Sequence, residues 1–258
     1  KDSEAWKLER EIERKFKVRH AVAVNSGTAA LHCALAAVGV QGCDVITSPY
    51  TFSATASAIL LAGGRPVFAD VDPYTFCITK ETVKHAITKK TAAILPVHLF
   101  GFFSPITDLR EFGVPILEDA CQAVGAQRNG IYSGTCGAAG VYSFNGSKNI
   151  PAGEGGCLVT NSDKIAEKAR LFANHQENFG SQEVGYNYRI QEVVACIARH
   201  GLLALEERNK RRQDLAFELY RSARGCRSVG KGWFAKPSVM FTVNRDGNHV
   251  FYCNPVLL

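Results

Sequence analysis

Along its first half, the sequence alternates between segments with the hydrophobic period of a helix and short apolar runs typical of strands. Leu8, Ile12 and Phe16 recur at helical spacing, which favours a helix over residues 3–18. After this helix, the pattern predicts strands at 21–24, 45–47, 66–69, 92–97 and 115–117, and helices at 26–38, 53–62, 81–87 and 107–112. This alternation predicts an α/β fold, with a parallel or mostly parallel sheet covered by helices on both faces.

The pattern changes at Gly137. A Gly-rich loop at 151–156 separates two predicted strands, and two long helices follow them. These elements are expected at residues 139–144, 157–159, 163–173 and 191–222. The polar segment 176–183 contains Gly180 and is expected to be a mobile loop near the substrate.

The hydrophobic pattern weakens beyond Gly225, where only residues 249–252 look like a strand. We therefore divide the chain into a large domain of residues 1–224, which includes the long connecting helix, and the start of a small domain at residues 225–258. The small domain is expected to be incomplete, as in a fragment or a truncated product.

Composition narrows the classes of protein that fit. Apolar residues make up 46% and charged residues 21%, which excludes a disordered or fibrous chain. The net charge of +6 is mild and spread along the chain, so nucleic acid is not an expected partner, although an anionic small substrate is compatible. Nine cysteines without a C-x-x-C motif argue against a disulfide scaffold and favour a cytoplasmic location. The longest apolar stretch, at 54–62, is too short and too polar to span a membrane.

Several familiar site motifs are missing. The sequence has no G-x-S-x-G nucleophile elbow, and residues 153–156 lack the spacing of a dinucleotide-binding loop. Residues 146–148 do not match a P-loop, because serine precedes the lysine and asparagine follows it. The histidines show no pair at metal-ligating spacing, so no metal site is expected.

Two segments offer an anion site and an acid. Ser26, Gly27 and Thr28 join a strand to a helix, and a helix N-terminus with a hydroxyl can bind an anion, although a plain helix cap explains it equally well. Glu118 and Asp119 follow an apolar strand, at the end where ligands bind in open α/β sheets. The alternative for Asp119 is an ordinary capping residue.

Two further segments offer an amine and an aromatic surface. Lys148 lies in a loop between two strands and precedes a Gly-rich turn, where it can act as a nucleophile or be no more than surface charge. Tyr50 and Phe52 precede a helix and can form a stacking surface or pack in the core. Together, the four segments match the needs of pyridoxal phosphate: a lysine, an acid, a phosphate cradle and an aromatic face.

The sequence resembles the DegT/DnrJ/StrS family of pyridoxal-phosphate-dependent sugar aminotransferases, which have the aspartate-aminotransferase (type I) fold. The resemblance rests on six segments that occur in the family's order between residues 3 and 222. They are residues 25–31, 49–55, 96–101, 118–123, 143–156 and 185–189.

The resemblance implies roles for individual residues. Lys148 forms the Schiff base with the cofactor and shuttles the proton. Asp119 pairs with the pyridine nitrogen, Phe52 stacks on the ring, and Gln122 lies on the side of the phenolic oxygen. The cofactor phosphate is held by Gly27, Thr28, Ala29 and Ser143.

The resemblance also implies roles for Asn187 and Arg189. Asn187 reaches the cofactor phosphate of a neighbouring subunit, so the resemblance implies a homodimer with shared active sites. Arg189 is a candidate for binding anionic groups of the substrate or amino donor, and a structural salt bridge is its alternative.

The implied reaction moves an amino group, expected from glutamate, to a keto group of a nucleotide-linked sugar. Relatives with histidine at the lysine position resemble dehydratases, so Lys148 favours amino transfer. The alternatives are an aminocyclitol or aminobenzoate-type enzyme that uses the same cofactor, and a regulatory or cofactor-binding relative without turnover. A nucleotide-binding module without this cofactor is disfavoured by the missing motifs.

Overall fold

The computed structural model describes residues 2–176, 184–225 and 249–253. Residues 177–183 of the expected mobile loop and most of the expected small domain therefore lie outside the described residues. The boundary between the two domains stays a prediction.

Seven of the described strands form one mostly parallel sheet, as the sequence predicts. The main strands are β1 (His20–Val24), β2 (Asp44–Thr47), β3 (Arg65–Phe68), β4 (Thr91–Leu95), β5 (Leu117–Asp119), β8 (Ala139–Ser143) and β9 (Gly156–Thr160). Hydrogen bonds give the orders β3-β2-β4 and β5-β8-β9-β1, and parallel bridges from Ile94 to Ile116 and from Val97 to Asp119 join the two sets. Among these strands, β9 alone runs in the opposite direction to the rest, and it separates β1 from β8.

The helices agree with the predicted pattern, apart from three local differences. They are α1 (Glu4–Phe16), α2 (Gly27–Val38), α3 (Ser53–Leu61), α4 (Lys80–Ala86), α5 (Asp163–Ala173), α6 (Glu192–Leu203) and α7 (Leu205–Gly225). The predicted helix at 107–112 is a 3₁₀ helix, and a second short 3₁₀ helix covers Leu99–Gly101.

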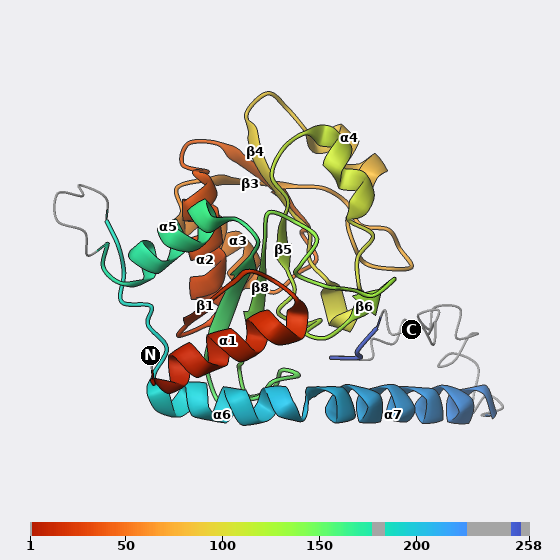
Figure 1. Cartoon of the computed structure of the whole chain (residues 1–258). Coiled ribbons are helices and arrows are strands. Elements are labelled where there is room, and N and C mark those ends of the chain that lie inside the picture. Colours follow the sequence, from red (N-terminus) through yellow and green to blue (C-terminus); the bar gives the residue numbers. More distant parts are fainter. Residues whose placement is uncertain (1, 177–183, 226–248, 254–258) are drawn as a thin grey trace.

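The long helix predicted at 191–222 is interrupted at Ala204, although α6 and α7 continue end to end along the base of the molecule (Figure 1). The Arg208 guanidinium donates a hydrogen bond to the carbonyl of Gly201. In a continuous helix this carbonyl would accept the N–H of residue 205, so Arg208 compensates for the break.

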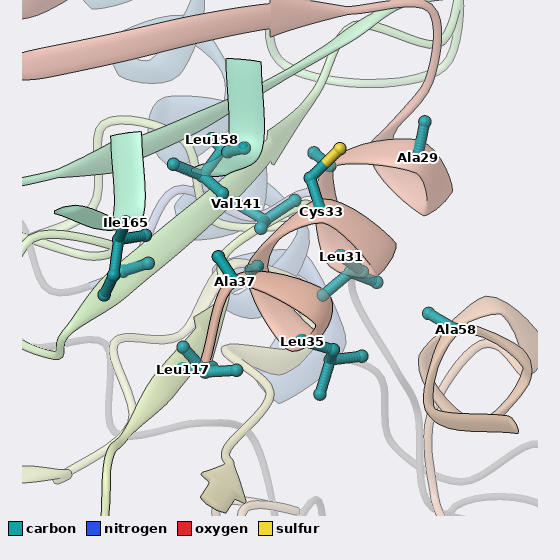
Figure 2. Packing of buried hydrophobic residues seen from close by; sticks show 14 of the residues in the cluster. Ala29, Leu31, Cys33, Leu35, Ala37, Ala58, Leu117, Val141, Leu158 and Ile165 are labelled. Carbon is teal, nitrogen blue, oxygen red and sulfur yellow. The ribbon is translucent and has the colours of Figure 1, made fainter. Parts of the chain in front are cut away.

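Helix α2 lies at the centre of the largest apolar cluster. Most of its residues are small or apolar all around the helix, as expected for a helix that is buried on all faces. Leu31 and Leu35 of this helix belong to one cluster with Val141 and Leu158 of the sheet and Ile165 of α5 (Figure 2). A second cluster packs α1 and α6 against the opposite face of the sheet, so helices cover both faces.

Glu118 in β5 is a fully buried carboxylate that is held by four N–H groups. One oxygen accepts the backbone N–H groups of Cys136 and Gly137, and the other accepts those of Gly134 and of the His98 ring. His98 Nδ1 accepts the N–H of Ser104, so the ring proton is on Nε2 and points at Glu118. The carboxylate therefore ties β5 to the loop that precedes β8.

We expect Glu118→Gln to lower the free energy of unfolding by about 3–5 kcal/mol. Whichever way the amide is turned, its NH₂ group faces two N–H donors and leaves them without an acceptor. Urea unfolding at neutral pH measures the loss, and the exposed Glu167→Gln is the matched control. Equal midpoints for the two variants would contradict this account of Glu118.

Within the described ranges, we find no helix with the length and apolar character that crossing a membrane requires.

Candidate active site

A cavity of about 630 Å³ opens where the carboxyl ends of β1, β2, β5 and β8 meet. This is the edge at which ligands bind in open α/β sheets. The connections that follow these four strands line it, together with Leu99 and Phe100 after β4 and with Tyr252. Seven of the predicted site residues are among the lining residues: Gly27, Thr28, Phe52, Asp119, Gln122, Ser143 and Lys148.

Asp119 is the last residue of β5, and its side chain is 5% exposed. Successive side chains of a strand point to opposite faces, so Asp119 points into the cavity while Glu118 points away from it. One oxygen of Asp119 accepts the hydroxyl of Thr55 at 2.9 Å, and the other accepts the N–H of Cys121 at 3.2 Å. The structure thus supplies a buried acid with fixed orientation on the cavity wall.

The Cys121 thiol beside Asp119 stays protonated at neutral pH. Burial raises the pKa of Cys121 well above its ordinary value, and the negative charge of Asp119 raises it further. The thiol is therefore a poor nucleophile, and it contributes bulk to the cavity wall.

The N-terminus of α2 forms a cradle of backbone N–H groups. The Ser26 hydroxyl caps the helix by accepting the N–H of Ala29 at 3.0 Å, so Ala29 is already bonded and does not line the cavity. The N–H groups of Gly27 and Thr28 have no partner inside the helix. A Cβ on Gly27 would lie 3.0 Å from both Cys121 Sγ and Ser143 Cβ, so glycine permits this close approach. The helix cap is thus confirmed. The capped start also faces the cavity, and its role as an anion site stays a prediction.

Lys148 lies half-buried in the loop after β8. Its amine is 4.1 Å from the centre of the Tyr252 ring, and the Tyr252 hydroxyl is 3.1 Å from Ser147 Oγ. Hydrogen bonds inside the loop hold its backbone, since the N–H of Lys148 donates to the Asn145 carbonyl and Asn145 Oδ1 accepts the N–H of Ser147.

A buried amide pair fixes the other side of Lys148. Asn149 is fully buried, and its amide donates at 2.7 Å to Asn209 of α7. Asn209 donates in turn to the carbonyl of Val124. Because buried amides lose free energy when they lack partners, this pair anchors the lysine loop to α7.

Phe52 and Gln122 both line the cavity, but Phe52 is largely exposed, whereas Gln122 is held by a hydrogen bond. Phe52 is the N-cap residue of α3, and its side chain is 69% exposed. The Gln122 side-chain oxygen accepts the N–H of Phe100 at 2.9 Å, so its NH₂ group is the part left to donate toward the cavity.

Asn187 and Arg189 are exposed and do not line the cavity of their own chain. The Asn187 carbonyl accepts the side-chain amide of Asn25, and Arg189 pairs with Val24 at the end of β1. The Arg189 guanidinium donates a hydrogen bond to Oδ1 of Asn174 at 2.6 Å. This partner is a neutral amide, whereas the alternative role expected for Arg189 was a structural salt bridge.

The sequence did not identify Tyr252, Thr55 or Asn209 as site residues. The expected strand at 249–252 is a single bridge between His249 and Phe102, continued by a hydrogen bond from Val250 to Gly101. This segment nevertheless brings the Tyr252 ring to the lysine amine. An aromatic residue in a weakly patterned segment is the only signal that could have suggested it.

Burial lowers the pKa of His249 from 6.5 to about 3. Between these values the unfolded chain binds a proton that the folded chain does not, so this contribution to stability is present above pH 6.5 and is lost as the pH falls toward 3. We expect stability to fall by up to about 1.4 kcal/mol per pH unit in this window, and His249→Gln to remove that slope. Urea unfolding across pH measures it, with the exposed His85→Gln as control; unchanged slopes in His249→Gln would contradict the assignment.

Curated relatives match a large part of the chain. A GDP-perosamine synthase of Vibrio cholerae is 37% identical over 225 residues, which are 84% of this chain and 61% of that protein. A pleiotropic regulatory protein of Geobacillus stearothermophilus is 42% identical over 199 residues, 74% of this chain and 54% of that protein. The chain thus spans a little over half the length of these two relatives.

Solved structures show the same fold. DesV of S. venezuelae, in complex with a ketimine intermediate, has a TM-score of 0.86 and 32% identity, and the match covers 96% of this chain and 67% of that one. NtdA of Bacillus subtilis, with bound cofactor PMP, has a TM-score of 0.85 and 28% identity, over 99% of this chain and 59% of that one. The sequence profile of one family matches residues 2–232. This chain belongs to the DegT/DnrJ/EryC1/StrS aminotransferase family.

Proposed function

We propose that this chain belongs to an enzyme that uses pyridoxal phosphate to transfer an amino group to a keto group of a nucleotide-linked sugar. The observation that carries the proposal is the meeting of Lys148, Asp119 and the N-terminus of α2 in one cavity. Relatives point to the same substrate class, since one is named a GDP-perosamine synthase and the solved structure of DesI contains its TDP-sugar product.

The cavity fits this cofactor on three counts. Gly27 and Thr28 offer free helix N–H groups to a phosphate, and Ser143 adds a hydroxyl close to Gly27. Asp119 offers a buried negative charge to a protonated ring nitrogen. Gln122 offers an NH₂ group to a ring oxygen, and Phe52 offers an apolar face. When bound, pyridoxal phosphate supplies an electron sink for the carbon that carries the amino group.

The chain's own residues then position that carbon and move its proton. The Lys148 amine lies on the cavity wall in a loop braced by Asn149, so it can take and return a proton at Nζ without the backbone moving. Asp119 stays oriented because both of its oxygens accept hydrogen bonds from the protein. Asp119 ends β5, and Lys148 lies in the loop after β8. A planar ring between them would therefore be held from two sides.

We further propose a homodimer in which Asn187 completes the partner's site. Asn187 is exposed and lies outside its own cavity, as a residue that serves a neighbouring chain would be. Large apolar side chains are exposed on the same stretch of chain, and such patches mark protein interfaces. They are Val184, Tyr186, Val193 and Ile197.

Other parts of the proposal concern the donor and the location. Glutamate is the proposed amino donor, and the exposed guanidinium of Arg189 is a candidate for its carboxylates or for the substrate phosphates. A cytoplasmic location is compatible with the free thiols found throughout the described ranges.

An aminobenzoate-type enzyme is one alternative that a solved structure supports. A solved 3-amino-5-hydroxybenzoic acid synthase matches with a TM-score of 0.85 and 29% identity, over 96% of this chain and 66% of that one. The fold therefore does not separate the two substrate classes. Activity assays separate the two classes, with GDP- or TDP-linked keto sugars as one set of substrates and precursors of aminobenzoates as the other.

Lys148 is the expected attachment point of the cofactor. Incubation with pyridoxal phosphate followed by borohydride should add a pyridoxyl mass to the peptide that contains Lys148. Lys148→Gln should abolish this label, whereas the exposed Lys164→Gln should keep it. Specific labelling of a different lysine would contradict the assignment.

Shared sites predict complementation between two inactive variants. Mixing Lys148→Ala with Asn187→Asp should restore about a quarter of the wild-type activity, because half of the dimers are mixed and each has one intact site of two. The introduced aspartate acts by repelling a phosphate. Lys148→Ala mixed with Asp119→Asn is the matched control, since both residues line one chain's cavity and every site keeps a lesion. If the first mixture is as inactive as the control, the sites are not shared.

A further inference from the structure

A chain of two hydroxyl groups leads from the start of α3 to Asp119. Thr55, in the first turn of α3, is 1% exposed, and its hydroxyl lies 2.9 Å from Asp119 Oδ2. Thr51, just before the helix, is half-buried, and its hydroxyl lies 2.9 Å from that of Thr55. Both threonines line the cavity.

The acceptor at one end fixes the direction of this chain. An ionised carboxylate has no proton to give, so the single hydroxyl proton of Thr55 points at Asp119. The Thr55 oxygen must then accept the hydroxyl proton of Thr51. Both hydroxyl groups are thus oriented by Asp119, and Thr55 contributes one of the carboxylate's two donors, with the N–H of Cys121 as the other.

The same contacts also connect two elements of the site, the start of α3 and the end of β5. Phe52 lies between the two threonines in sequence and is the N-cap residue of α3, where no side-chain hydrogen bond caps the helix. The Thr55–Asp119 bond ties this helix start to the end of β5. One buried hydrogen bond therefore ties the helix start that carries Phe52 to the strand end that carries Asp119.

We propose that Thr55, itself oriented by Thr51, is a positioning residue that sets the orientation of the Asp119 carboxylate toward the ring nitrogen of the cofactor. A hydroxyl that donates to a carboxylate stabilises the anion. Together with the N–H of Cys121, it also limits rotation of the carboxylate. This inference rests on the proposed function, because it concerns how the chain receives pyridoxal phosphate.

The test compares three single variants with the wild type. Thr55→Val keeps the shape of the side chain and removes its hydroxyl, and Thr55→Ser restores the hydroxyl. Thr47→Val is the control, because Thr47 is a fully buried threonine whose hydroxyl donates to the carbonyl of Leu95, away from Asp119. Each protein is stripped of cofactor and titrated with pyridoxal phosphate, and the absorption spectrum of the loaded form is followed against pH.

We expect Thr55→Val to bind pyridoxal phosphate about tenfold more weakly and to shift the pH midpoint of the spectral change, whereas Thr47→Val loses stability only. Thr55→Ser should restore both values. Unchanged affinity and midpoint in Thr55→Val, or no rescue by Thr55→Ser, would overturn the inference while leaving the proposed function intact. Failure of the wild type to bind pyridoxal phosphate would overturn the proposed function, and the inference with it.

The role of Thr51 is tested by non-additivity. Since Thr51 acts through Thr55, the double variant Thr51→Val/Thr55→Val should bind the cofactor as Thr55→Val does. Additive losses would overturn the hydroxyl chain. If Thr55→Val does not fold, Thr51→Val replaces it, since Thr51 is only half-buried; it should weaken binding in the same direction, and no change would count against the proposal.

Discussion

Two neighbouring carboxylates on one buried strand set the layout of the site. Glu118 and Asp119 point to opposite faces of the sheet, and Glu118 is held by four N–H groups while Asp119 faces the cavity. A shift of β5 by one residue would exchange the faces of the two acids, so that Glu118 would face the cavity and Asp119 would face away from it. The bonds to Glu118 therefore fix the register of β5, and through it the position of Asp119.

The other parts of the site depend on the same edge of the sheet. The parallel strands β1, β2, β5 and β8 end there, and each is followed by a connection that supplies one element of the cavity. Polar contacts then brace these connections: Thr55 ties α3 to β5, and Asn209 ties the lysine loop to α7. At the rim, Phe100 has a φ of 57°, a strained value for a bulky residue, and its N–H orients Gln122.

Much of the fold could be predicted from local patterns. The strands that carry the site and the long helices were found because their periodicity and caps are short-range features, and the mostly parallel sheet follows from their alternation. The hairpin of β6 (Gln127–Arg128) and β7 (Ile131–Tyr132) was missed, although the Asn129-Gly130 turn that forms it has the usual sequence signal. The break at Ala204 was also missed. Its compensation is a hydrogen bond from the Arg208 side chain to the carbonyl of Gly201, and such a contact does not appear in the hydrophobic pattern.

The sequence by itself determined the elements, the glycine at the helix start and the order of the motifs, because each of these depends on neighbouring residues. It marked Lys148 and Asp119 as candidates, but it did not decide that they share a cavity or which of the two acids faces it. Those outcomes depend on strand order and on N–H groups from distant loops, as do the roles of Thr55, Asn209 and Tyr252. A period of two places neighbouring side chains on opposite faces, and only the packed structure decides which face is the cavity.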